Sequence, residues 1–226
     1  MGRWDCLVEL RTTVHRVRHG GEEYRVVKAV PRSGRAVLFR KEWSLDMFVD
    51  LEVARNVAAG WGLVARSRRS LVYVPLRAER EGPGGLPGWF HSSVVDLVLV
   101  QGGLGFPVSR WKAVRAGLGA GRPQVMEIPE TDFSGEKEPE DWRRDELRFG
   151  FAAETLFLTG SAEAFRWTGA RVHSLVREGP ARALAGSPWR PYDSVMLHHE
   201  GDLTAKGPVK GPGVLNIEYA HGWKAG

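Results

Sequence analysis

One stretch of the chain predicts two successive elements, and it constrains the fold more than any other feature. Residues 147–158 are rich in aromatic and aliphatic side chains and end at a Thr-Gly-Ser turn, which is typical of a strand. Within 161–177 apolar residues recur at steps of three and four, which predicts an amphipathic helix that ends at Gly179-Pro180. Arg166 and Arg171 lie on the opposite side of that helix. We therefore expect a strand packed against a helix whose outer face carries arginine.

The composition is that of a globular protein. The chain has 226 residues, of which 42% are hydrophobic and 26% are charged, so it is long enough for one large or two small domains. No apolar run approaches the roughly 20 residues that cross a bilayer, and the first residues lack the apolar core of a signal peptide. We predict a cytoplasmic protein without a membrane partner.

Cys6 is the only cysteine, which excludes an internal disulfide and a cysteine-based zinc site. A small apolar residue on a buried strand face is the preferred interpretation of Cys6. Neither a metal nor a cofactor is predicted, because no nucleotide-binding fingerprint or dense ligand spacing occurs.

The first part of the chain predicts β-structure followed by a helix. Apolar and polar residues alternate in 7–17, and β-rich runs follow at 24–30 and 35–40, which predicts a three-stranded antiparallel meander. Ser44 is a candidate N-cap for a helix expected over 45–59.

The segments that follow are shorter. Strands are expected at 63–66 and 71–76, on either side of a turn that contains Arg68 and Arg69. The β-branched residues of 93–101 fit a buried strand and a helix equally well. A short basic helix is predicted over 107–116, between glycine-rich segments.

The chain divides at a stretch of glycine and proline around residue 84, which is too poor in apolar groups to pack. We predict a basic meander-and-helix module over 1–80, a loop or linker over 81–92 and an α+β module over 93–226. Strands near 194–200 and 214–219 complete a C-terminal strand-helix-strand module, whose order of elements is compatible with a ferredoxin-like fold. The fold class is α+β, and no internal repeat occurs at a fixed period.

The charge favours a polyanionic partner. Lys and Arg total 32 against 27 Asp and Glu, a formal net charge of +5, and arginine offers a planar fork to phosphate. Several tryptophans stand beside basic residues, a combination that suits stacking of bases in single-stranded nucleic acid. The candidate nucleic-acid-binding residues are Arg32, Arg35, Arg68, Arg69, Arg110, Trp111, Lys112, Arg166, Arg171, Lys206 and Lys210.

The loop 206–213 is the strongest phosphate-binding candidate, because Lys206 and Lys210 alternate with glycines that let a polyanion approach the main chain. It does not match a Walker loop, and its prolines remove amide donors. A rigid surface hairpin remains the alternative.

His198 and His199 are the candidates for catalysis. Neighbouring residues on a strand point to opposite faces, so one of the two could serve a given pocket as a general acid or base. No third ligand stands at a suitable spacing for a metal. Asp46 and Asp50, four residues apart on the expected helix, are interpreted as capping and solvated groups. On balance the sequence favours a protein that is not an enzyme.

The order of strand, helix 161–177, basic glycine loop and final strand resembles the ferredoxin-like modules of CRISPR-associated RNA-binding proteins. The resemblance covers residues 148–220 and implies that the loop at 206–213 contacts RNA. The chain departs from that pattern in the extra segment 181–200 and in the prolines of the loop.

We therefore predict a nucleic-acid-binding subunit of a larger complex, acting on RNA or single strands with other protein subunits as partners. Three alternatives stay open. They are a structural or assembly protein of a multi-subunit particle such as a viral one, a metal-independent phosphoesterase or nuclease that uses His198 or His199, and a small-ligand-binding protein.

Overall fold

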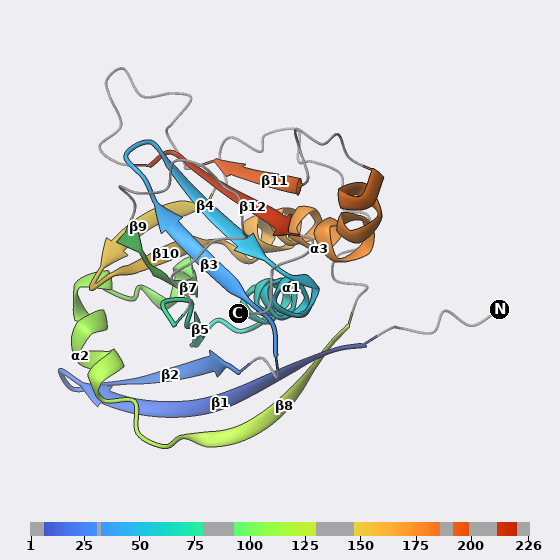
Figure 1. Ribbon diagram of the computed structural model, residues 1–226. Helices are drawn as coiled ribbons and strands as arrows, with labels where there is room; N and C mark the ends of the chain where they lie inside the picture. The colour runs from blue at the N-terminus through green and yellow to red at the C-terminus, as the bar shows by residue number, and fades with distance from the viewer. Residues whose placement is uncertain are drawn as a thin grey trace.

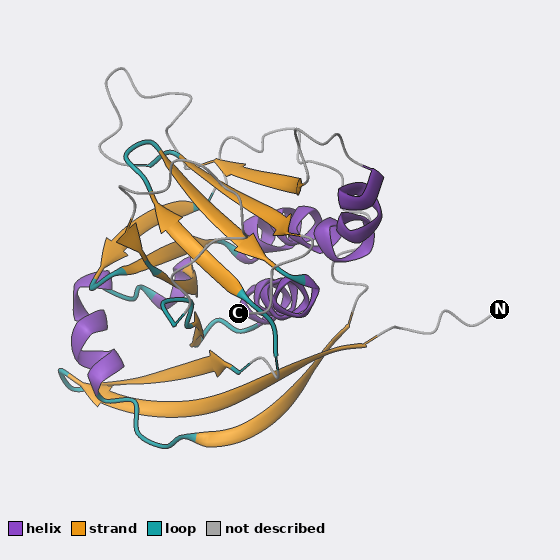
Figure 2. Cartoon of the chain, viewed as in Figure 1, coloured by secondary structure: helices purple, strands orange, loops and turns teal. Residues whose placement is uncertain are grey.

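Strands carry most of the buried apolar side chains, and they form two sheets (Figures 1 and 2). The computed structural model describes residues 7–30, 33–78, 93–129, 147–185, 192–198 and 212–220. The predicted α+β class is confirmed. None of the helices in these ranges is long and apolar enough to cross a membrane.

Within the described residues, sheet A has seven strands and sheet B has five. In sheet A the order is β8 (Arg122–Pro129), β1 (Leu7–His19), β2 (Glu22–Ala29), β5 (Ser70–Val74), β7 (Asp96–Gln101), β10 (Thr155–Gly160) and β9 (Arg148–Ala152). In sheet B it is β11 (Tyr192–His198), β12 (Val214–Ala220), β4 (Ser44–Val49), β3 (Ala36–Arg40) and β6 (Ser93–Val94). The predicted modules 1–80 and 93–226 contribute strands to both sheets.

The helices are α1 (Leu51–Arg66), α2 (Trp111–Ala116) and α3 (Ala162–Ala185), with short 3-10 turns η1 (Gly102–Leu104) and η2 (Val108–Arg110). Helix α1 lies between the two sheets, where it contacts β1, β5 and β7 of sheet A, β4 of sheet B and helix α3 (Figure 1). Helix α3 packs on β11 and β12. Helix α2 covers the opposite face of sheet A, above Phe157 and Tyr73.

The helix predicted over 45–59 begins too early and ends too early, because the observed helix α1 is Leu51–Arg66. Ser44–Val49 is strand β4, and the N-cap is Asp50, whose carboxylate accepts a hydrogen bond from the Val53 N–H at 2.9 Å. Strand β4 is buried on both faces, so its sequence lacks the polar alternation of a surface strand.

The same helix continues to Arg66, through the segment 63–66 that we expected to be a strand. Gly60 does not end it, because this position packs against Val72 and Leu99 of sheet A. Burial around nearly the whole circumference of α1 explains why its sequence shows no clear polar face.

The N-terminal meander is present only in part. Strands β1 and β2 form the expected antiparallel hairpin, and the predicted third strand exists as β3. However, β3 pairs with β4 and β6 in sheet B instead of with β2. The chain therefore crosses from one sheet to the other between β2 and β3.

The region that reads as one strand over 147–158 is a hairpin of β9 and β10. Ala153 and Glu154 form its turn with φ of 47° and 57°, a left-handed conformation that neither residue type signals in a sequence. The undecided segment 93–101 contains strands β6 and β7, and the predicted helix over 107–116 corresponds to η2 and α2.

The amphipathic helix is confirmed as α3, with Phe165, Thr168, Val172 and Leu175 buried. It continues past Gly179 to Ala185 with Pro180 inside it. Gly179 lies against the ring of Tyr219, so the glycine serves close packing here and does not end the helix.

A repeat of topology underlies this arrangement, although the sequence shows no fixed period. The order hairpin, helix, hairpin occurs first as β3-β4, α1, β5-β7 and again as β9-β10, α3, β11-β12. Each repeat places one hairpin in each sheet, and the repeats meet through the parallel pairs β4-β12 and β7-β10. The two helices occupy equivalent positions and contact each other, with the Trp61 Nε1 donating to Thr168 Oγ1 at 3.1 Å.

Candidate nucleic-acid interface

Arginine side chains gather where α1 ends against sheet A. Arg16 of β1 lies opposite Arg25 of β2, and Arg25 lies opposite Ser70 at the start of β5. Neighbouring residues on a strand point to opposite faces, and the apolar residues next to Arg16, Arg25 and Ser70 belong to the cluster under α2. Arg16, Arg25 and Ser70 therefore lie on the face of sheet A that is turned toward α1. The last turn of α1 and the turn after it complete the group, which we name the arginine rim: Arg16, Arg18, Arg25, Arg66, Arg68 and Arg69.

Most side chains of the arginine rim are exposed to solvent. Arg16 and Arg18 lie 3.6 and 3.5 Å from the carboxylate of Glu23, yet their side chains are 76% and 88% exposed. Arg25 Nη1 donates to Ser70 Oγ at 2.9 Å, and Arg66, Arg68 and Arg69 are exposed. Strand spacing of about 4.8 Å places Arg16, Arg25 and the turn before Ser70 within about 10 Å of one another. The rim is therefore a compact cationic surface able to contact several phosphates.

Helix α3 begins beside this rim. Gly160, just before α3, pairs with Gln101, and the Gln101 Nε2 donates to the carbonyl oxygens of Val64 and Ala65 at 3.3 Å each. The first turns of α3 therefore lie next to the last turns of α1. On the outer side of α3, Arg166 is exposed, and the Arg171 guanidinium lies over the ring of Trp167 at 5.6 Å.

Helix α2 does not present the aromatic interface that we expected. Trp111 is fully buried, its ring contacts Tyr73 and Phe157, and its Nε1 donates to Thr155 Oγ1 at 2.9 Å. Arg110 Nη1 donates to a Glu22 carboxylate oxygen at 2.7 Å and to the Tyr24 hydroxyl at 2.6 Å. Both side chains therefore stabilise the hairpin of β1 and β2 and the core beneath α2.

The remaining predicted residues are dispersed. Lys112 is exposed on α2, which covers the face of sheet A opposite α1. Arg35 immediately precedes β3, and its backbone N–H donates to Asp50 Oδ2 at 2.6 Å. Arg32, Lys206, Lys210 and His199 fall outside the described residues, so the loop 206–213 stays a prediction.

His198 ends strand β11, next to Val214 of β12, and its Nδ1 is buried without a hydrogen-bond partner. It shares its face of sheet B with Met196 and not with Val195 or Leu197. Among the residues that the structure describes, no three His, Cys, Asp or Glu side chains gather closely enough to hold a metal ion.

Sequence reasoning missed a polar cluster on the outer face of sheet B. Asp46, expected on a helix, lies on β4 and is 4% exposed. Its carboxylate accepts hydrogen bonds from Asn216 Nδ2 at 2.7 Å and Ser44 Oγ at 3.2 Å, and Lys41 Nζ lies at 2.7 Å. Burial, and then the charge of Asp46, raise the pKa of Glu218 to about 7. The parallel pairing of β4 with β12 creates this cluster, and nothing in the sequence indicates that pairing.

A second buried carboxylate, Asp96, lies at the start of β7, a central strand of sheet A. Its Oδ1 accepts from the backbone N–H groups of Leu76 and Arg77, at 2.8 and 3.1 Å. Its Oδ2 accepts from the Tyr73 hydroxyl and Arg77 Nε at 3.0 Å each, with Arg115 Nη1 at 3.4 Å. Because all of its acceptor positions are used within the protein, this carboxylate stabilises the fold.

Searches against family models, curated proteins and solved structures returned no match for this chain. The chemistry of the described surfaces is therefore the basis for inferring a function.

Proposed function

We propose that this protein binds RNA or another single-stranded nucleic acid through the arginine rim, as a cytoplasmic subunit of a larger complex. The observation that carries the proposal is the convergence of the partly exposed Arg25 of β2 with exposed arginines from β1, the last turn of α1 and the turn before β5. Guanidinium groups pair with phosphate oxygens in bidentate geometry, and their positions on rigid elements limit the entropy lost on binding.

The start of α3 supports a single-stranded ligand over a duplex. Trp167 is partly exposed, and Arg171 stacks on its ring beside the rim. A splayed base can stack on such an exposed aromatic and guanidinium surface, whereas a base inside a duplex is already stacked. The phosphates of the same strand would then lie along Arg166 and the rim.

The proposal of a larger complex has separate support. Arg11, Val30, Pro123 and Val125 line an open hollow of about 490 Å³ on the outer face of β8, β1 and β2. Val30 and Val125 are 43% and 50% exposed. Such an apolar hollow next to a cation suits contact with a protein neighbour.

The test is the affinity for a fluorescently labelled 12-nucleotide oligouridine, measured by anisotropy at low salt. The variant Arg68→Ala/Arg69→Ala should bind at least tenfold more weakly than wild type, because it loses two phosphate contacts. The matched control Arg122→Ala/Arg177→Ala removes two exposed arginines from β8 and the far part of α3, and it should bind within about twofold of wild type.

Equal weakening in both double variants would show that only net charge matters and would refute the assignment to the rim. The same RNA should remain intact after incubation. Metal-independent cleavage that disappears in His198→Ala with binding retained would favour the alternative of a nuclease.

A further inference from the structure

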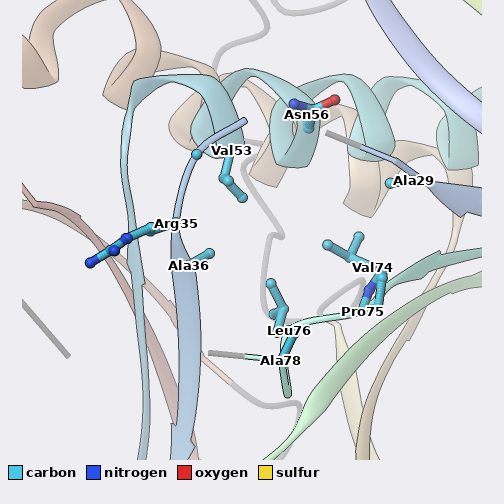
Figure 3. A pocket seen from close by; sticks show the side chains of 10 residues that line it. Ala29, Arg35, Ala36, Val53, Asn56, Val74, Pro75, Leu76 and Ala78 are labelled. Atoms are coloured by element: carbon cyan, nitrogen blue, oxygen red, sulfur yellow. The ribbon is translucent and has the colours of Figure 1, made fainter. Parts of the chain in front are cut away.

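A small cavity opens where the chain leaves sheet A for sheet B, at the N-terminal half of α1 (Figure 3). It has a volume of about 230 Å³. Its walls are the end of β2, the start of β3, the segment after β5 and the first two turns of α1. The arginine rim lies at the other end of α1, so the two sites are separate.

The position of the cavity follows from the topology. Strands β2 and β5 are parallel neighbours, and the cavity lies at their carboxyl ends. After these ends the chain departs in different directions, to β3 in sheet B and away from β5, which leaves a crevice. Alanine at 29, 36 and 78 leaves space that larger side chains would fill.

The walls are held in place by hydrogen bonds. Asp96 accepts from the backbone N–H groups of Leu76 and Arg77 and so fixes the segment after β5. Asp50 accepts from the backbone N–H groups of Arg35 and Val53 and so ties the start of β3 to α1. The cavity is therefore preformed, which lowers the entropic cost of binding.

Asn56 is the buried polar side chain among the lining residues. It is 5% exposed, and its Nδ2 donates to the Glu52 carbonyl oxygen at 2.7 Å. This bond orients the amide and leaves the Oδ1 to act as an acceptor. Figure 3 shows Asn56 on α1 near Val53, with Val74 and Leu76 across the cavity, while the Arg35 guanidinium points away from these side chains.

We propose that this cavity binds a small, neutral and mainly apolar molecule that carries one N–H or O–H donor, such as a single aromatic heterocycle. The aliphatic walls remove the apolar surface of the ligand from water, and the Asn56 Oδ1 accepts its one donor. A charged ligand is disfavoured because it would lose hydration without an opposite charge in the cavity.

Indole and 1-methylindole form the test pair, because they differ in the N–H donor. In two-dimensional NMR of the ¹⁵N-labelled full chain, indole should shift the Asn56 side-chain amide and the backbone amides of Val53 and Leu76 in a saturable way. 1-Methylindole should bind about fivefold to tenfold more weakly, the ratio expected for one hydrogen bond.

Two variants keep the test decisive. Ala36→Leu should fill the cavity and abolish the indole shifts. Ala78→Leu changes an exposed residue at the edge of the cavity, so it should fold normally and still weaken indole at least fivefold. Absence of saturable shifts at Asn56, or equal affinity for both compounds, would overturn the proposal. RNA binding should be unchanged in Ala78→Leu.

Discussion

Replacing Asp96 by Asn tests whether its buried carboxylate holds the start of β7 to the segment after β5 and to α2. Asp96 is 2% exposed and has hydrogen bonds or an ion pair with Tyr73, Leu76, Arg77 and Arg115. In the variant the amide oxygen can take the place of Oδ1 and accept the two backbone N–H hydrogen bonds. The amide nitrogen would then replace Oδ2 and place a donor against the guanidinium donors of Arg77 and Arg115.

The cost follows from these contacts. A hydrogen bond to a charged group contributes about 1.5–3 kcal/mol, and breaking a fully buried ion pair costs about 3–5 kcal/mol. The side chains of Arg77 and Arg115 are 33% and 24% exposed, so water recovers part of that cost. We therefore expect Asp96→Asn to lower the free energy of unfolding by about 3 kcal/mol. Urea unfolding at pH 7, followed by tryptophan fluorescence, measures the change.

Two matched variants separate the contributions. Tyr73→Phe removes one hydrogen bond to this carboxylate and should cost about 1.5–3 kcal/mol. Glu154→Gln removes the ion pair between Glu154 and Arg77. The Glu154 side chain is 68% exposed, so this change should cost less than about 1 kcal/mol. A loss below about 1 kcal/mol for Asp96→Asn would refute the structural role assigned to this carboxylate.

Three further changes test the electrostatics and backbone of the fold. The pKa of Glu218 is raised above its unfolded value, so the stability that the protonated carboxyl contributes is lost as the pH rises through about 7. Glu218→Gln should therefore be more stable than wild type at pH 8, by roughly 1 kcal/mol after solvent screening, and should not be more stable at pH 5. Burial, and then the charge of Lys28, lower the pKa of His15, so wild-type stability should fall as the pH drops below about 6.5. Thermal unfolding of His15→Gln should show a smaller loss of stability between pH 7 and 5 than wild type. An equal loss of stability in the variant would contradict this cause. Gly121 has φ of +66° and no room beside Thr13 and His15, so Gly121→Ala should destabilise the protein by roughly 1–3 kcal/mol in urea unfolding, and a neutral effect would argue against the strain.

Local signals predicted individual elements well where one face was polar. The stripe of Phe165, Thr168, Val172 and Leu175 predicts α3, and the alternation in 7–17 predicts β1. The same rules failed for β4 and the second half of α1, because burial on all sides removes the polar face on which periodicity depends.

Pairing between distant strands was beyond a reading of local pattern. The parallel pair of β4 with β12 joins residues about 170 positions apart and creates the cluster of Asp46, Asn216 and Glu218. The arginine rim was partly predicted through Arg68 and Arg69, whereas Arg16 and Arg25 join it only through strand register. Trp111 was misassigned because a basic sequence neighbourhood does not reveal that its ring points into the core.

The salt dependence of RNA binding tests the central claim most directly. Each phosphate contact to a single strand contributes about −0.7 to the slope of log K against log salt concentration. If about four rim arginines contact phosphates, wild type should give a slope of about −3, and Arg68→Ala/Arg69→Ala should reduce its magnitude by about 1.4. A wild type that shows no binding at low salt, or a slope that the rim variant leaves unchanged, would contradict the account.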